Sequence, residues 1–465
     1  MNRTLLVLVV SWASFTSGPL LQGLEVGIAR ERITPPLGMP MAGYYHERGA
    51  VDIHDDLYAR AIVLREGDTL AALVSLDLIT TRRDQVLAAR KIISARTEIP
   101  GDHVLVSATH AHTGPVLMTK SKRRIGQKGK NPLVEEYSEK LPGKIADAVE
   151  KALSRLQPAA VWSAMGFEDS LAFNRRFHMT DGSVGWNPGK LNPRIIKAAG
   201  PIDPDVGVVL FRGRDERPFG AFVNYAVHLD NVGGPSLSAD LPYSLGESLA
   251  RVMGDDFETV YMTGACGDVN HVNVQWGQAQ KGHQNAARMG TVLAGSVLRT
   301  WPDLERVGGP LSVVSKVVPL EIAPITEAEI EPAQKTVEEG NDRGRANFMK
   351  LVKAHQVLDV ADRKGRPFEV EVQVVALGTR LAWVALPGEM FVQLGLDLKL
   401  DSPFESTMVA ELANGSIGYI PNLRAYPQGN YEVVSARCAA GSGERLIATA
   451  VDLLKQLYQA HQGAE

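Results

Sequence analysis

HVLVSATHAHTGP, residues 103–115, joins a short apolar run typical of a buried strand to a turn that carries two histidines. His110 and His112 are two of only 11 histidines in the 465 residues of the chain. In an extended chain, residues i and i+2 face the same side, and the following Gly114–Pro115 pair turns the chain away. The spacing therefore predicts two imidazoles that point into one cleft at the end of a strand, where they are candidates for metal binding or proton transfer.

Apolar runs of strand length alternate along the chain with longer segments of helical spacing. The predicted strands are 57–64, 70–77, 103–108, 206–211, 220–227, 258–264, 311–323, 369–378, 380–388 and 407–415. The predicted helices are 82–97, 133–156, 241–254, 281–300, 327–360, 390–400 and 443–461. This order predicts an α/β fold with mixed β-sheets flanked by helices, in a single large domain over 24–465. A seam between two lobes is expected near 302–310, and no internal repeat is visible.

The composition is that of a folded globular protein, with 45% hydrophobic and 22% charged residues. A net charge of −4 argues against general nucleic-acid binding. The one notable charge run, TKSKRRIGQKGK (119–130), is expected to be a solvated loop. The alternative is that it forms a rim of the site that favours an anionic group.

The N-terminus has the pattern of a secretory signal peptide over residues 1–23, with Arg3 before an apolar stretch that small residues follow. An apolar strand or a membrane anchor is the alternative. No later stretch is apolar for long enough to form a transmembrane helix. We therefore expect a secreted or periplasmic protein. In that compartment Cys266 and Cys438 form either one disulfide or two buried free thiols, and the sequence leaves this open.

Three more polar residues follow predicted strands in the same way as the histidines. His228 comes after GAFVNYAV, Glu389 after RLAWVALPG, and Tyr419 after TMVAELANG. Ligands of α/β proteins gather outside the carboxyl ends of strands, and zinc takes nitrogen and oxygen donors of these kinds. The alternatives are an acidic first turn of a helix for Glu389 and a half-buried aromatic for Tyr419. The shared position at strand ends favours a single site.

The motifs at these positions resemble a known family. They are VGIARERITPP (26–36), MAGY (41–44), LYARAIVL (57–64), VSLD (74–77), SATHAHTGP (107–115), FNRR (173–176), NYAVH (224–228), GDVN (267–270), LPGE (386–389) and NGSIGYIP (414–421). In this order they resemble the neutral, non-lysosomal ceramidase family, specifically its catalytic N-terminal domain. Members of that family are zinc amidases that cleave the N-acyl bond of ceramide.

The resemblance implies roles for six residues. It implies one Zn²⁺ per chain, with the ligands His110, His228, Glu389 and Tyr419. It also implies that His112 lies near the attacking water and the scissile carbonyl, and that Arg175 lines the same site. We therefore expect a secreted zinc-dependent amidohydrolase that cleaves an N-acyl amide bond by metal-activated water.

Two departures from the family pattern bear on the substrate. Asn270 stands where the family usually has a serine that was a candidate nucleophile, which favours attack by water. The chain is also expected to lack the immunoglobulin-like C-terminal domain, and the segment 424–444 is altered. The expected partner is a small-molecule or lipid N-acyl substrate, with peripheral membrane contact. The alternatives are a zinc hydrolase of other small amides or esters, and a non-catalytic secreted binding protein on the same scaffold.

Overall fold

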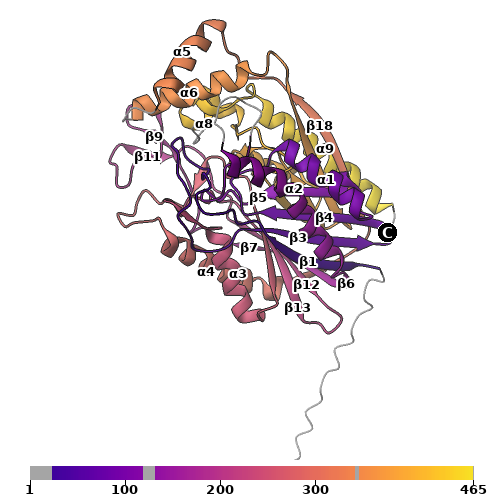
Figure 1. Ribbon diagram of the computed structural model, residues 1–465. Helices are drawn as coiled ribbons and strands as arrows, with labels where there is room; N and C mark the ends of the chain where they lie inside the picture. Colours follow the sequence, from indigo (N-terminus) through magenta and orange to yellow (C-terminus); the bar gives the residue numbers. More distant parts are fainter. Residues whose placement is uncertain (1–22, 119–130, 341–344, 464–465) are drawn as a thin grey trace, which may run out of the picture.

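Three β-sheets surround a common apolar core, and helices cover their outer faces (Figure 1). This computed structural model describes residues 23–118, 131–340 and 345–463. The predicted signal peptide, apart from Gly23, and the basic run 119–130 lie outside the described residues. The predicted class, mixed sheets flanked by helices, is confirmed.

The three large sheets follow one another along the chain. The first has the order β5–β4–β3–β1–β6, with β1 Glu25–Arg32, β3 Tyr58–Glu66, β4 Thr69–Leu76, β5 Val104–Ala108 and β6 Gln157–Pro158. The second has the order β15–β13–β12–β7–β17, with β7 Ala160–Phe167, β12 Asp205–Arg212, β13 Pro218–Tyr225, β15 Glu258–Thr263 and β17 Glu305–Val307. The third has the order β18–β19–β20–β22, with β18 Leu311–Leu320, β19 Phe368–Leu377, β20 Leu381–Ala385 and β22 Ser406–Ala410.

The three sheets repeat one arrangement, although no repeat is visible in the sequence. Each contains two antiparallel pairings followed by one parallel pairing: β1–β3–β4–β5, β7–β12–β13–β15 and β18–β19–β20–β22. In each sheet a helix joins the two parallel strands, as such a crossover requires: α1 Arg83–Arg96, α3 Leu241–Met253 and α7 Val392–Asp401. The carboxyl ends of each parallel pair therefore lie at one edge of its sheet.

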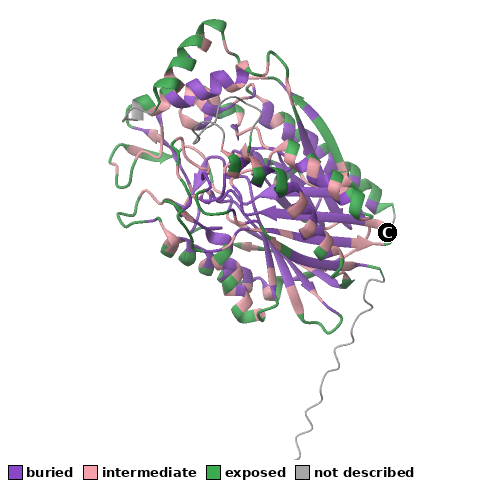
Figure 2. Ribbon diagram, in the orientation of Figure 1, coloured by how far each residue is buried: buried purple, intermediate pink, exposed green. Residues whose placement is uncertain are grey.

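Each sheet is covered by its crossover helix and by a second long helix later in the chain. These second helices are α2 Pro132–Leu153, α4 His283–Arg299 and α9 Ser442–Gln462. Strand β3 shows how the sequence builds both layers, because its side chains alternate between the two faces. Ala61 and Val63 pack in the core beneath α1 and α2, whereas Ile62 and Leu64 join the core between the sheets. Figure 2 shows the resulting buried strands between half-exposed helices.

A helical hairpin extends beyond the three layers at the top of Figure 1. It consists of α5 Glu327–Glu339 and α6 Arg345–Ala361, which form a small apolar cluster of their own. The prediction of one helix over 327–360 is wrong, because α5 ends at Gly340 with a positive φ of 78°. The predicted strand 311–323 also ends earlier, at Leu320.

Short elements line the loops between the layers. They are β2 Asp52–Ile53 with β14 Ser236–Leu237, β8 Phe173–Asn174 with β16 Val269–Asn270, the sheet of β9 Arg176–Met179, β10 Val184–Trp186 and β11 Ile195–Ala198, β21 Glu389–Met390 with β23 Tyr419–Ile420, the helix α8 Tyr431–Ser435, and the 3₁₀ turns Gly101–His103, Trp301–Asp303 and Leu423–Gln428. Several of these short elements carry the candidate site residues.

The ends of the last parallel strand of each sheet meet at Glu411. Its backbone N–H donates to the carbonyl of Thr263 at 3.1 Å, and its own carbonyl accepts from Oγ of Ser107 at 2.9 Å. These three residues stand within one residue of the ends of β22, β15 and β5. The carboxyl ends of parallel strands from all three sheets therefore converge on one region.

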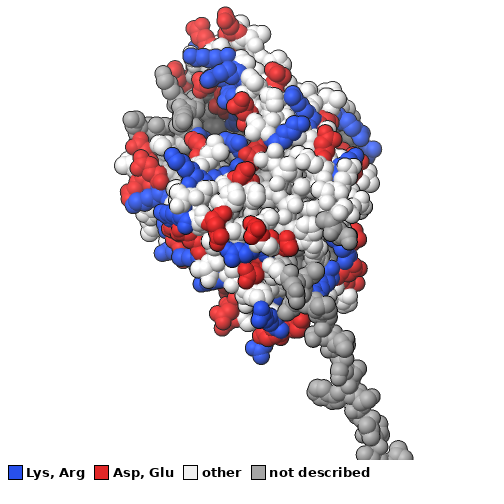
Figure 3. Space-filling model, turned by 90° about the vertical axis from the view of Figure 1, so that its right-hand side faces the viewer, with Lys and Arg blue, Asp and Glu red and all other residues white. Residues whose placement is uncertain are grey.

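The surface fits the small net charge. On the face shown in Figure 3, acidic and basic side chains are interspersed. Among the described residues, no helix has the length and apolar character that a membrane crossing requires.

Candidate metal centre

His110 is held in an unusual backbone conformation just after β5. Its φ is +72°, and its N–H donates to the carbonyl of Leu78 at 2.9 Å. Its Nδ1 lies 2.7 Å from the carbonyl of Ile79, to which it donates. Since Nδ1 carries the hydrogen, Nε2 presents its lone pair on the opposite side of the ring. The loop after β4 therefore fixes both the tautomer and the direction of this imidazole.

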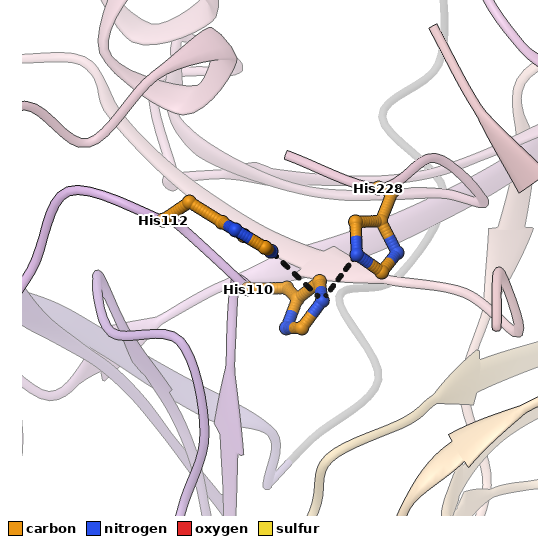
Figure 4. A group of neighbouring side chains, drawn as sticks. All are labelled: His110, His112 and His228. Carbon is orange, nitrogen blue, oxygen red and sulfur yellow. Dashed lines mark hydrogen bonds between the residues drawn. The ribbon is translucent and has the colours of Figure 1, made fainter. Parts of the chain in front are cut away.

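Two further imidazoles face this lone pair (Figure 4). Nε2 of His228 lies 2.8 Å from Nε2 of His110, and Nε2 of His112 lies 3.4 Å from it. The ligating atoms of the three histidines all lie within 4.8 Å of one another. His110 and His228 are buried, with only 3% and 2% exposure. The histidines that the sequence placed in one cleft are thus brought together.

Glu389 joins the group from the third sheet. Its Oε2 lies 3.6 Å from Nε2 of His110, and this buried oxygen has no hydrogen-bond partner among the described residues. Nδ1 of His228 is likewise buried without a partner in the described part of the chain. Buried polar atoms are costly when unpaired, so they indicate a partner that the protein itself does not supply.

Tyr419 lies beside Glu389 because β21 and β23 are parallel and pair these two residues directly. Its hydroxyl accepts a hydrogen bond at 3.1 Å from the guanidinium of Arg175. Burial and then Glu389 raise the pKa of Tyr419 well above its usual range, against the opposing effect of Arg175. Tyr419 therefore keeps its proton unless a cation binds close by.

Arg175 is a buried, fixed cation at the same place. Its guanidinium also donates to the carbonyl of Gly267 at 2.6 Å and to Oε1 of Glu432 at 2.8 Å. Burial acts to lower the pKa of Arg175, but Tyr419 and Glu432 raise it well above its usual range. The positive charge is thus permanent and aimed at the tyrosine oxygen.

Glu432 is a residue that the sequence analysis missed. It is fully buried, and its other oxygen accepts from Arg176 at 3.0 Å. It lies in α8, inside the segment 424–444 that was singled out only as altered. The doubled arginine in FNRR was a signal, because two adjacent buried arginines require a buried carboxylate.

A second missed acid, Asp230, lies near His112. Nδ1 of His112 lies 3.8 Å from Oδ1 of Asp230, which also accepts a hydrogen bond from the hydroxyl of Tyr44 at 2.8 Å. Burial is the main cause that lowers the pKa of His112 to about 3, with Asp230 opposing and His110 and Arg175 adding. The imidazole is therefore neutral at pH 7.

The donor set fits a divalent transition metal. Two imidazoles, a carboxylate and a phenol are nitrogen and oxygen ligands of the kind that zinc takes. Burial, followed by His110 and Arg175, lowers the pKa of His228 well below its usual range, so that its ring is uncharged. Two imidazole nitrogens 2.8 Å apart, next to a carboxylate oxygen without a partner, are best satisfied by a cation.

The two cysteines are both free and buried, so the disulfide alternative is wrong. The thiol of Cys266 donates to Oε1 of Glu411 at 3.0 Å. Burial and Glu411 raise the pKa of this thiol well above its usual range, which makes it a poor nucleophile. Asn270, at the family's serine position, donates instead to the side chain of Asn187.

Solved structures of ceramidases have the same arrangement of strands and helices. A crystal structure of neutral ceramidase from Pseudomonas aeruginosa superposes with a TM-score of 0.73 at 18% identity, over 94% of this chain and 75% of that one. A ceramidase complexed with C2 gives a TM-score of 0.73 at 17% identity, over 94% of this chain and 76% of that one. No protein-family model and no curated protein matches the chain. The chain therefore has the fold of the neutral ceramidases, as its motifs predicted.

Proposed function

We propose that the chain is a zinc-dependent hydrolase of N-acyl amide bonds, similar to ceramidases and acting outside the cytoplasm. One observation carries this proposal: Nε2 of His110 lies 2.8 Å from Nε2 of His228 and 3.6 Å from Oε2 of Glu389. The ceramidase fold and the motif order support the substrate class, a lipid or small molecule with an N-acyl group. Zinc as the metal and secretion rest on the sequence motifs.

His110, His228, Glu389 and Tyr419 would hold the ion. A divalent ion in such a site supplies Lewis-acid polarisation of the amide carbonyl and makes water a stronger acid. The remaining chemistry belongs to the chain itself, and it requires a proton acceptor, a proton donor for the leaving amine, and a fixed positive charge.

His112 meets the first two requirements. Its ring is neutral at pH 7, and its Nε2 lies 3.4 Å from Nε2 of His110. It accepts the proton of the attacking water at this atom, and the Asp230 carboxylate behind the ring stabilises the cation that forms. The same proton then passes to the leaving nitrogen.

Arg175 meets the third requirement by holding Tyr419 in place and by placing a buried cation beside the reacting carbonyl. Because Glu432, Gly267 and Asp268 all fix Arg175, its charge needs no rearrangement during the reaction. Removing such a preorganised donor typically lowers kcat by about 100-fold or more.

The test is hydrolysis of a series of N-acyl substrates that differ in acyl length, by the purified protein before and after chelation. The proposal expects activity that chelator abolishes and Zn²⁺ restores, and that His110→Ala lowers by about 100-fold or more. His178→Ala, outside the histidine group, is the matched control. Activity in metal-free protein would overturn the proposal.

The acyl-length series also separates the alternatives. Preference for long acyl chains supports a ceramidase-like substrate, and strong preference for short ones identifies a hydrolase of small amides. A binding protein on this scaffold would show no turnover of any N-acyl substrate, and His110→Ala would leave its ligand binding intact.

A further inference from the structure

A second cluster of metal-ligating side chains lies outside the candidate metal centre. His54 follows β2, and His283 is the first residue of α4. Their rings are stacked, with centroids 3.7 Å apart and planes inclined by 11°. The ligating atoms of His54, Asp55 and His283 all lie within 4.8 Å of one another. None of these residues has a part in the proposed hydrolysis.

Asp55 fixes the tautomer of His54. It is buried, and its Oδ1 accepts from the N–H of Ala239 at 2.7 Å, while its Oδ2 accepts from Oγ of Ser238 at 2.6 Å. Oδ2 also lies 2.8 Å from Nδ1 of His54. An ionised carboxylate can only accept, so Nδ1 of His54 carries the hydrogen and Nε2 presents its lone pair.

This pairing is the one that metal-binding histidines show. A histidine ligand commonly donates its second ring N–H to a carboxylate, which orients the ring and makes the ligating nitrogen more basic. The His54 side chain is 43% exposed, with one ring face stacked on His283. His54 and Asp55 are therefore arranged like a metal ligand and the carboxylate that orients it.

The local charge also favours a cation. Partial burial and then His54 lower the pKa of His283, with Asp55 and Asp52 acting in the opposite direction. Two imidazoles thus lie together beside the carboxylate of Asp55. Imidazole nitrogen selects zinc, nickel or copper over magnesium and calcium, which prefer oxygen ligands.

We propose that His54 and His283 form a second site for a divalent transition metal, with Asp55 as the carboxylate that orients His54. The ion replaces the ring stack and joins the segment after β2 to the start of α4. Its role is structural: Asp55 holds Ser238, whose carbonyl accepts from Oγ1 of Thr113 at 2.8 Å, and Thr113 directly follows His112. The second ion therefore stabilises the segment that carries His112 and takes no direct part in the reaction.

The test measures Zn²⁺ binding in a full-length variant that lacks the first centre, His110→Ala/His228→Ala. After chelation and dialysis, calorimetric titration with Zn²⁺ is expected to give about one ion per chain. Zn²⁺ is also expected to raise the thermal midpoint of this variant. Adding His54→Gln and His283→Gln should remove both effects, whereas adding His178→Gln should remove neither.

Two results would overturn the second site: no zinc binding by His110→Ala/His228→Ala, or equal binding after His54 and His283 are also replaced. The variants are compared by circular dichroism without zinc, and the fold should persist when His54 and His283 are replaced because neither ring is buried. If the fourfold variant does not fold, Co²⁺ absorption of His110→Ala/His228→Ala with and without His54→Gln decides the question. An unchanged Co²⁺ spectrum counts against the site. Neither result bears on hydrolysis, so this inference stands or fails separately from the proposed function.

Discussion

Glu389 lies directly opposite Tyr419 in the parallel pair of β21 and β23. Paired residues on neighbouring strands project to the same face of a sheet, so the carboxylate and the phenol are delivered side by side. They belong to segments that are 30 residues apart, 389 against 419, and that follow different strands of the third sheet. The backbone pairing, more than any side-chain contact, sets their separation.

Replacement of Glu389 by glutamine tests this arrangement. Glu389→Gln keeps the shape and the strand pairing but removes the negative charge next to Nε2 of His110. We expect zinc affinity to fall by about tenfold or more and hydrolysis by about 100-fold, with little change in thermal stability of the metal-free protein. Metal titration and initial rates check this, with the exposed Glu331→Gln as the control. Unchanged zinc affinity would remove Glu389 from the ligand set.

Glu432 is expected to matter for both stability and catalysis. Glu432→Gln leaves Arg175 and Arg176 as buried cations without their carboxylate, and breaking buried ion pairs typically costs about 3–5 kcal/mol. Denaturant unfolding should register this loss. In the fraction that stays folded, kcat should fall more than KM rises, because Arg175 no longer holds Tyr419. A variant with normal stability and normal kcat would show that Glu432 does not position Arg175.

The cysteines give a test of the fold that does not depend on function. Cys266 and Cys438 are buried free thiols, so the native protein should react slowly with a thiol reagent. After unfolding in guanidinium, both cysteines should titrate without any reductant. The sequence contains two cysteines, so a titration that finds fewer than two reactive thiols would indicate a disulfide.

His271 should contribute to acid sensitivity of the fold. Burial is the main cause that lowers its pKa to about 4, with Asp230 opposing and Lys281 adding. The unfolded chain takes up a proton near pH 6.5 and the folded chain only near pH 4, so stability is present above pH 6.5 and is lost as the pH falls toward 4. From pH 7 to 5 this loss is about 2 kcal/mol. His271→Gln should reduce the difference in unfolding free energy between these pH values by that amount. An equal pH dependence in the variant and the parent would contradict this assignment.

Much of the layer structure follows from local pattern. The alternation of Ala61 and Val63 with Ile62 and Leu64 already predicts a strand with two buried faces. The split of α5 from α6 was missed although the sequence GNDRG (340–344) carries turn signals, because helical spacing continues on both sides of it. The threefold arrangement of the sheets was not visible in the sequence, since many different apolar sequences can form strands in the same order.

The sequence by itself determined which residue types stand at the ends of the strands: imidazoles at 110, 112 and 228, a carboxylate at 389 and a phenol at 419. It could do so because strand periodicity and turn residues are local signals. Only the tertiary structure decided that these ends meet, and that Glu432 and Asp230 support Arg175 and His112. Such contacts join residues far apart in the chain, and they depend on how three separately formed sheets pack around one core, which no local pattern records.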